Sequence, residues 1–139
     1  MRKLLRNTFF ATIAAGIIIC LITNPVLFYG QNTPGPSVDT ARLRSEVAWL
    51  CNSPFPRNVD HPELLDSAAR WIAAELKKEG ILSWEQVYEV NGKKYRNVCC
   101  SFGPRTAKRV IAGAHYDVCG DQAGADDNAS GTVGLLEMA

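Results

Sequence analysis

The stretch that decides the fold runs from Arg109 to Met138 and reads RVIAGAHYDVCGDQAGADDNASGTVGLLEM. Residues 109–114 contain the continuous apolar run Val-Ile-Ala, which is typical of a strand buried on both faces of a sheet. From Ala129 onward the apolar residues suit a helix that packs back on that sheet. The stretch therefore predicts a strand-loop-helix unit of an α/β protein.

Two polar motifs lie where such a sheet places its ligands, beyond the carboxyl end of the strand. His115 and Asp117 would point to the same side of an extended backbone, so Asp117 could accept a proton from the imidazole nitrogen that binds no metal. Asp126 follows on a loop whose glycines, Gly120 and Gly124, would let it return to the strand end. Imidazole nitrogen and carboxylate oxygen are ligands that suit zinc.

A carboxylate such as Asp126 can bridge two cations through its two oxygens. Two metals about 3.5–4 Å apart can polarise a carbonyl and generate hydroxide at neutral pH, as attack on an amide requires. Each motif alone has an ordinary interpretation, a surface ion pair for His115 and Asp117 and a helix cap for Asp126. Their conjunction at a strand end followed by a helix favours a hydrolytic metal site.

Two amphipathic helices are predicted ahead of this unit. Asp39 can cap the first helix. The second begins at Asp60 or His61, has Pro62 in its first turn and ends at Gly80. Their apolar stripes are Leu43, Val47 and Leu50 in the first helix, and Leu65, Ala69, Ile72 and Leu76 in the second.

A β-hairpin is predicted between the second helix and the motifs. Residues 84–90 and 94–102 flank the dipeptide Asn91-Gly92, which accommodates the positive φ angles of a tight turn. Helices, a hairpin and a strand-loop-helix unit together indicate a three-layer α/β sandwich with a mixed sheet.

The first thirty residues have the composition of an export signal. Arg2, Lys3 and Arg6 precede an apolar run over residues 9–23. Residues 1–30 are predicted to be either a cleaved signal peptide or an uncleaved signal anchor helix, with 31–37 as a linker and 38–139 as the folded domain. The protein is accordingly expected to be exported, and either membrane-anchored through this segment or secreted or periplasmic.

Charge excludes one class of partner. The chain has 15 basic and 14 acidic side chains and a net charge of +1, so nothing indicates a polyanion, and nucleic-acid binding is not expected.

The cysteines leave one question open. In an exported domain Cys51 could pair with Cys99 or with Cys100, but not with both, because neighbouring strand residues face opposite sides. Cys119 could serve as a soft metal ligand or be an oxidation target, but it is interpreted as a packed loop residue.

The segment from Gly113 to Asp117, followed by Gly124-Ala-Asp-Asp-Asn-Ala-Ser-Gly131, resembles the signature of the co-catalytic two-zinc aminopeptidases of metallopeptidase family twenty-eight. That family also contains carboxypeptidase-like members and glutaminyl cyclases. The resemblance implies that His115 binds one zinc ion and that Asp126 bridges two. It also implies that Asp117 acts in catalysis by orienting His115, and that Asp127 holds the backbone at the bridging position. The family's glutamate general base and remaining ligands would lie downstream.

The resemblance implies a zinc exopeptidase that removes N-terminal residues from peptide or protein substrates. Residues 38–139 would be the N-terminal, truncated part of its domain, and this chain alone would be inactive. Two alternatives stay open. One is a non-catalytic, membrane-anchored fragment that acts by protein association, and the other is a glutaminyl cyclase-like relative.

Overall fold

A computed structural model describes residues 2–23, 35 and 37–139 of the chain. These residues fall into two units, 1–37 and 38–139, and each is considered by itself. The first unit contains the helix α1 (Arg2–Thr23). Within the described ranges, no helix has the length and apolar character needed to cross a membrane. Most of the predicted linker, 31–37, lies outside the described residues.

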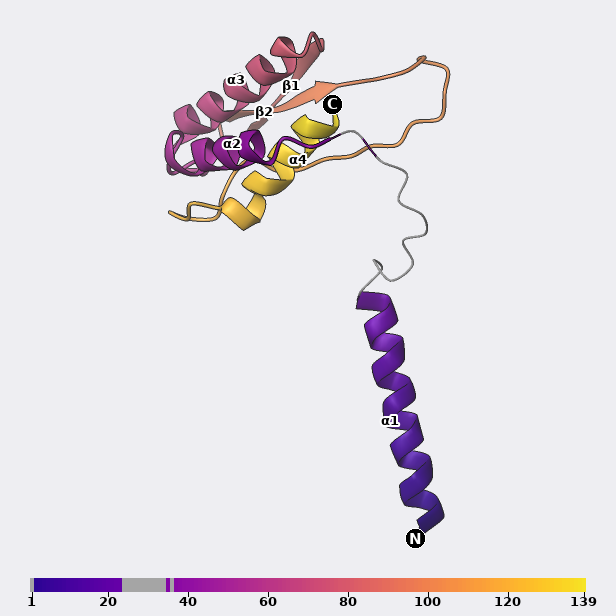
Figure 1. Ribbon diagram of the computed structural model, residues 1–139. Helices are drawn as coiled ribbons and strands as arrows, with labels where there is room; N and C mark the ends of the chain where they lie inside the picture. The colour runs from indigo at the N-terminus through magenta and orange to yellow at the C-terminus, as the bar shows by residue number, and fades with distance from the viewer. Residues whose placement is uncertain (1, 24–34, 36) are drawn as a thin grey trace. The chain divides into compact units, whose positions relative to one another are not determined.

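The two helices predicted at the start of the second unit are confirmed. Helix α2 (Thr40–Asn52) begins at Asp39, whose carboxylate accepts hydrogen bonds of 3.0 Å from the backbone N–H groups of Ala41 and Arg42. Helix α3 (Pro62–Lys78) has its proline at the first helical position. The two helices lie side by side in Figure 1.

The hairpin is also confirmed. Strands β1 (Ser83–Val90) and β2 (Lys93–Cys100) are antiparallel, and Val90 lies opposite Lys93. The two turn residues have φ angles of 51° at Asn91 and 76° at Gly92, as a tight hairpin turn requires. This hairpin contacts α3 along β2.

The strand predicted at residues 109–114 is wrong. This segment pairs with no strand, and Val110 and Ile111 are 96% and 92% exposed. A buried strand needs neighbours that complete its backbone hydrogen bonds, and none of the described residues supplies one beside it. In Figure 1 the orange segment after β2 runs outward as coil before it returns along α4. The sheet seen in the described residues is the antiparallel pair alone, which is compatible with an α/β protein but leaves the mixed sheet unconfirmed.

The core forms where α4 (Ser130–Met138) packs against α2 and α3. The buried residues form two clusters. The first cluster contains Leu50, Cys51, Ala68, Ala129 and Val133, and the second contains Ile72, Leu76 and Leu136. The rings of Trp49 and Trp71 stack against the first cluster with their centroids 4.7 Å apart. Because α4 contributes to both clusters, the turn that precedes it is fixed relative to both helices.

Cys51, Cys99 and Cys100 form no disulfide, so neither pairing that the sequence left open is formed. The clusters give the reason, since Cys51 is buried in the first one and Cys100 packs against the second. Cys119 is exposed rather than packed, which corrects its interpretation as a packed loop residue.

Candidate metal centre

His115 and Asp117 lie at the end of the extended segment, and the structure brings their side chains together. The His115 Nδ1 atom is 3.1 Å from Asp117 Oδ1 and 3.2 Å from the Asp117 carbonyl oxygen. With the proton on Nδ1, the imidazole donates to Asp117 and keeps a lone pair on Nε2. This is the arrangement in which a carboxylate orients a metal-binding histidine.

The carboxylate that faces the other imidazole nitrogen belongs to Asp127. Its Oδ1 atom is 3.0 Å from His115 Nε2. Asp126, the residue that the sequence analysis assigned to the metal, is exposed and makes no such ion-pair contact with His115 in the described part of the chain. The geometry therefore favours Asp127 over Asp126 as the carboxylate of the site.

The turn η2 (Ala125–Ala129) explains why the two aspartates differ. Its backbone departs from helical angles at Asp127 (φ −118°, ψ 85°) and at Asn128 (φ −139°, ψ 44°). The turn therefore presents neighbouring side chains in different directions. Periodicity in the sequence carries no signal of such a local change, which is why the sequence analysis assigned the metal to Asp126 and only a backbone role to Asp127.

The donor pair is of the right kind for zinc but is not a complete site. Nε2 of His115 and Oδ1 of Asp127 face each other at 3.0 Å, slightly closer than the roughly 3.3–3.6 Å between two ligand atoms bound at about 2.0–2.2 Å to one tetrahedral zinc ion. A structural or catalytic zinc site has at least three protein ligands. No three histidine, cysteine, aspartate or glutamate side chains in the described ranges are grouped so as to hold a metal ion.

Stability alone does not account for this arrangement. The side chains of His115, Asp117 and Asp127 are 52%, 60% and 72% exposed. Exposed ion pairs contribute between nothing and about 1 kcal/mol, while ordering their side chains has an entropic cost. These two contacts therefore contribute little to the stability of the fold.

The backbone on both sides of the site is held by one buried cation, Arg57, which is fully buried. Its guanidinium donates hydrogen bonds of 2.7–2.9 Å to the carbonyl oxygens of Leu50, Tyr116, Ala123 and Gly124. Burial lowers the pKa of Arg57 from its ordinary value, an effect that the nearby Cys51 and Asp117 oppose. Sequence reasoning missed Arg57, because its partners are backbone carbonyls that any residue offers.

Two further polar side chains fix the same region. Asn58 is 3% exposed and donates from Nδ2 to the Gly120 carbonyl oxygen at 2.8 Å. Thr132, in α4, is 5% exposed and donates from Oγ1 to the His115 carbonyl oxygen at 3.0 Å. Asn58 thus holds the loop that follows Asp117, and Thr132 holds the backbone of His115.

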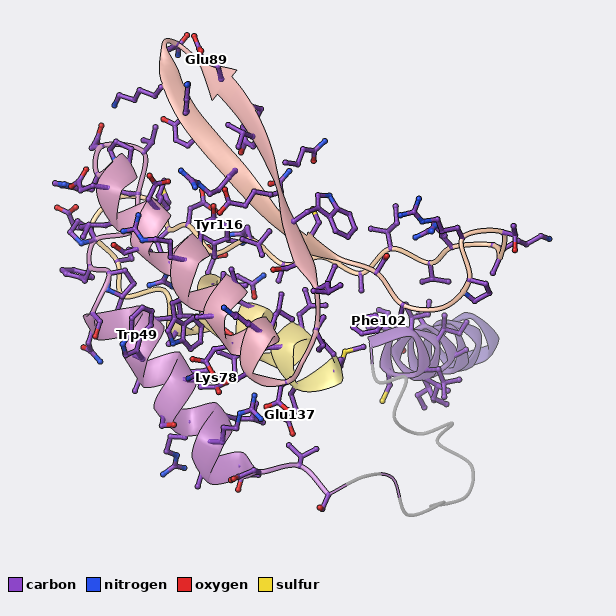
Figure 2. The ribbon with its side chains drawn as sticks, turned by 90° about the horizontal axis from the view of Figure 1, so that it is seen from above. Trp49, Lys78, Glu89, Phe102, Tyr116 and Glu137 are labelled. Carbon is purple, nitrogen blue, oxygen red and sulfur yellow. The ribbon has the colours of Figure 1, made fainter. Side chains whose placement is uncertain are left out.

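Tyr116, between the two residues that face solvent, points into the protein. It packs against both core clusters, and its hydroxyl donates a hydrogen bond of 2.6 Å to the carbonyl oxygen of Arg96 in β2. Figure 2 labels it between α3 and the hairpin. Burial raises the pKa of Tyr116 to about 12.

Comparison with known proteins identifies the region that contains these residues. Residues 97–139 match the model of peptidase family M28. This segment of the chain is therefore similar to the M28 peptidases. The matched segment includes His115, Asp117, Asp126 and Asp127, but Arg57 lies ahead of it.

A second comparison finds a relative of uncharacterised function. The protein YfbL of Escherichia coli strain K12 is 32% identical over 141 residues, which cover 91% of this chain and 44% of that protein. The chain therefore spans less than half the length of this relative. No solved structure matches the chain significantly.

Proposed function

We propose that this chain supplies part of a metal-dependent peptidase, and more specifically of a zinc aminopeptidase that removes N-terminal residues from peptides. The observation that carries the proposal is the imidazole of His115, held by Asp117 on one nitrogen and facing Asp127 Oδ1 at 3.0 Å with the other. The match of residues 97–139 to peptidase family M28 supports peptide hydrolysis in general.

His115 and Asp127 would hold the metal, and two zinc ions are the expectation for a complete domain. Asp117 accepts the Nδ1 proton, which fixes the tautomer and makes Nε2 a better donor. Zinc supplies polarisation of the scissile carbonyl and activation of water at neutral pH. Asp126 remains the competing candidate for the metal-facing carboxylate. The two assignments predict different losses of activity when each aspartate is replaced.

The remaining ligands and the general base would come from residues that follow this chain in a longer protein. Two observations support this part of the proposal. The described residues offer two converging donors rather than three, and the chain aligns with 44% of its relative. On this reasoning the 139-residue chain alone hydrolyses no peptide.

The test compares two matched variants in the full-length protein that contains this sequence. Hydrolysis of aminoacyl p-nitroanilides is measured after zinc is removed and then restored. We expect Asp127→Asn to lower kcat/KM by about 100-fold or more, since even outer partners of metal ligands are worth 10- to 100-fold. Asp126→Asn, the same change one residue earlier, should stay within about threefold, because the Asp126 side chain makes no ion-pair contact with His115.

Other outcomes would point elsewhere. Equal losses in the two variants would contradict the assignment of Asp127, and full activity without zinc would contradict a zinc peptidase. Cyclisation of glutaminyl peptides with release of ammonia, but no anilide hydrolysis, would favour the cyclase-like alternative.

We also propose export, on the basis of the cations at Arg2, Lys3 and Arg6 ahead of the apolar run. Residues 1–37 fused to a reporter enzyme that is active only outside the cytoplasm should give activity. Replacing the three cations by glutamate should abolish it. Inactive reporter protein that accumulates in the cytoplasmic fraction would refute export.

A further inference from the structure

Arg57 stands out because its burial and its partners are not those of an ordinary stabilising arginine. It is fully buried, and no carboxylate of the described residues lies within ion-pair distance of it. Burying an unpaired charge costs several kcal/mol, and replacing buried ions by apolar residues of similar volume is often neutral or stabilising. A reason for its presence therefore has to come from the atoms that it contacts.

Those atoms belong to the two segments that carry the candidate metal ligands. Nε donates to the carbonyl oxygen of Tyr116, the residue between His115 and Asp117, at 2.8 Å. The terminal nitrogens donate to the carbonyl oxygens of Ala123 and Gly124, at 2.7 Å and 2.9 Å, just ahead of the turn η2. The planar guanidinium thus joins both segments through one rigid group.

A fourth hydrogen bond ties this group to the rest of the fold. The same terminal nitrogen that reaches Ala123 also donates to the carbonyl oxygen of Leu50, in α2, at 2.7 Å. The backbone of Arg57 takes part as well, because its carbonyl oxygen accepts a hydrogen bond from the Val118 N–H at 3.0 Å. The distance between the two ligand segments is therefore set from the core and not by the exposed side chains of the site.

We propose that Arg57 is the positioning residue of the candidate metal centre, holding the segments of His115 and Asp127 at the spacing at which Nε2 faces Oδ1. The proposal deepens the proposed function, because it concerns the same site. A lysine cannot replace Arg57, since its single ammonium group lacks the planar fork that reaches carbonyls on two segments at once.

The test reads the histidine itself in the metal-free, 139-residue chain. The chain contains two histidines, so His115 gives one of two imidazole signals in nitrogen-15 NMR spectra, and His61, whose side chain is 45% exposed, serves as internal reference. In the native chain the Nδ1 signal of His115 should be that of a donor to Asp117. In Arg57→Met and Arg57→Lys we expect the His115 signals to move toward those of a short histidine peptide, with those of His61 unchanged.

A control separates positioning from general loss of stability. Ile81→Ala shortens a half-buried side chain that packs against the second cluster. Ile81 lies beside Leu136 and Glu137, at the end of α4 that is remote from η2. This variant should lose stability but keep the native His115 signals. If Arg57→Met does not fold, the comparison of Arg57→Lys with Ile81→Ala decides whether the His115 signals depend on Arg57 itself or on stability in general.

Two results would overturn the proposal. One is native His115 signals in a folded Arg57 variant, and the other is an equal shift in Ile81→Ala. Because this NMR measurement needs no metal and no substrate, its result is independent of whether the protein is a peptidase. In the full-length protein, competition with a coloured chelator should further show Arg57→Lys binding zinc about 10- to 100-fold more weakly, as for other residues that orient metal ligands.

Discussion

Substitution of Gly124 by alanine should damage the site far more than the same change at Gly120. Both glycines have left-handed backbones, with φ of 62° and 60°, so both variants bear a similar conformational cost of about 1–2 kcal/mol. At Gly120 a Cβ would meet nothing within 4 Å. At Gly124 it would overlap the side chain of Val118 and lie 2.7 Å from the Asp127 carbonyl oxygen and 2.9 Å from Arg57 Nη2.

These neighbouring atoms cannot easily move away from an added Cβ. Val118 is 6% exposed, the Asp127 contact is to backbone, and Arg57 is held by four carbonyl groups. Forcing an extra methyl group into packed surroundings costs about 1–3 kcal/mol. Gly124→Ala should therefore be less stable than Gly120→Ala by about 1–3 kcal/mol, which is roughly a 5- to 150-fold difference in the unfolding constant.

Urea unfolding followed by tryptophan fluorescence measures this difference, because the stacked Trp49 and Trp71 pack against the core that contacts η2. For a unit of this size, a loss of 1 kcal/mol lowers Tm by about 4 °C or more. Unfolding free energies of the two variants that agree within about 0.5 kcal/mol would contradict this expectation, since the shared backbone cost would then be the whole effect.

Three other perturbations have defined outcomes. Because the native state holds the Tyr116 proton up to a pKa of about 12, against about 10 when unfolded, this group's contribution to the unfolding free energy is complete below pH 10 and falls as the pH rises toward 12. Absorbance titration should show one late tyrosinate, and Tyr116→Phe should remove it; an unchanged late step would assign it to another tyrosine. Iodoacetamide should label the exposed Cys119 within minutes and the buried Cys51 only after unfolding. Mass spectrometry that finds both cysteines oxidised would contradict the presence of free thiols at these two positions. Chelation should abolish peptidase activity of the full-length protein and added zinc should restore it, whereas persistence of the activity would exclude zinc.

Local signals explain what the sequence predicts well. Asp39 before α2 and Pro62 at the start of α3 act within one helical turn, and the Asn91-Gly92 turn needs only its own backbone angles. Each of these features is decided by neighbours along the chain, and each is found in the structure.

The remaining features depend on distant partners. The run at 109–114 has the composition of a buried strand, but a strand exists only beside another strand. The choice between Asp126 and Asp127 depends on backbone angles that no pattern of residue types encodes. Arg57 bonds to carbonyl groups 59 to 67 residues away at Tyr116 and Gly124, and sequence alone does not show which carbonyls meet it.

The inward position of Tyr116 also constrains how the site can move. Its ring packs in the core and its hydroxyl is bonded to β2, while its neighbours His115 and Asp117 project outward. Rotation of the histidine segment about its own axis would pull this ring out of its packing and break the bond to the hairpin. Local opening of the hairpin and loss of order at His115 should therefore be a single cooperative event, with the β2 amides and the Val118 amide, which donates to the Arg57 carbonyl oxygen, exchanging hydrogen at matching rates.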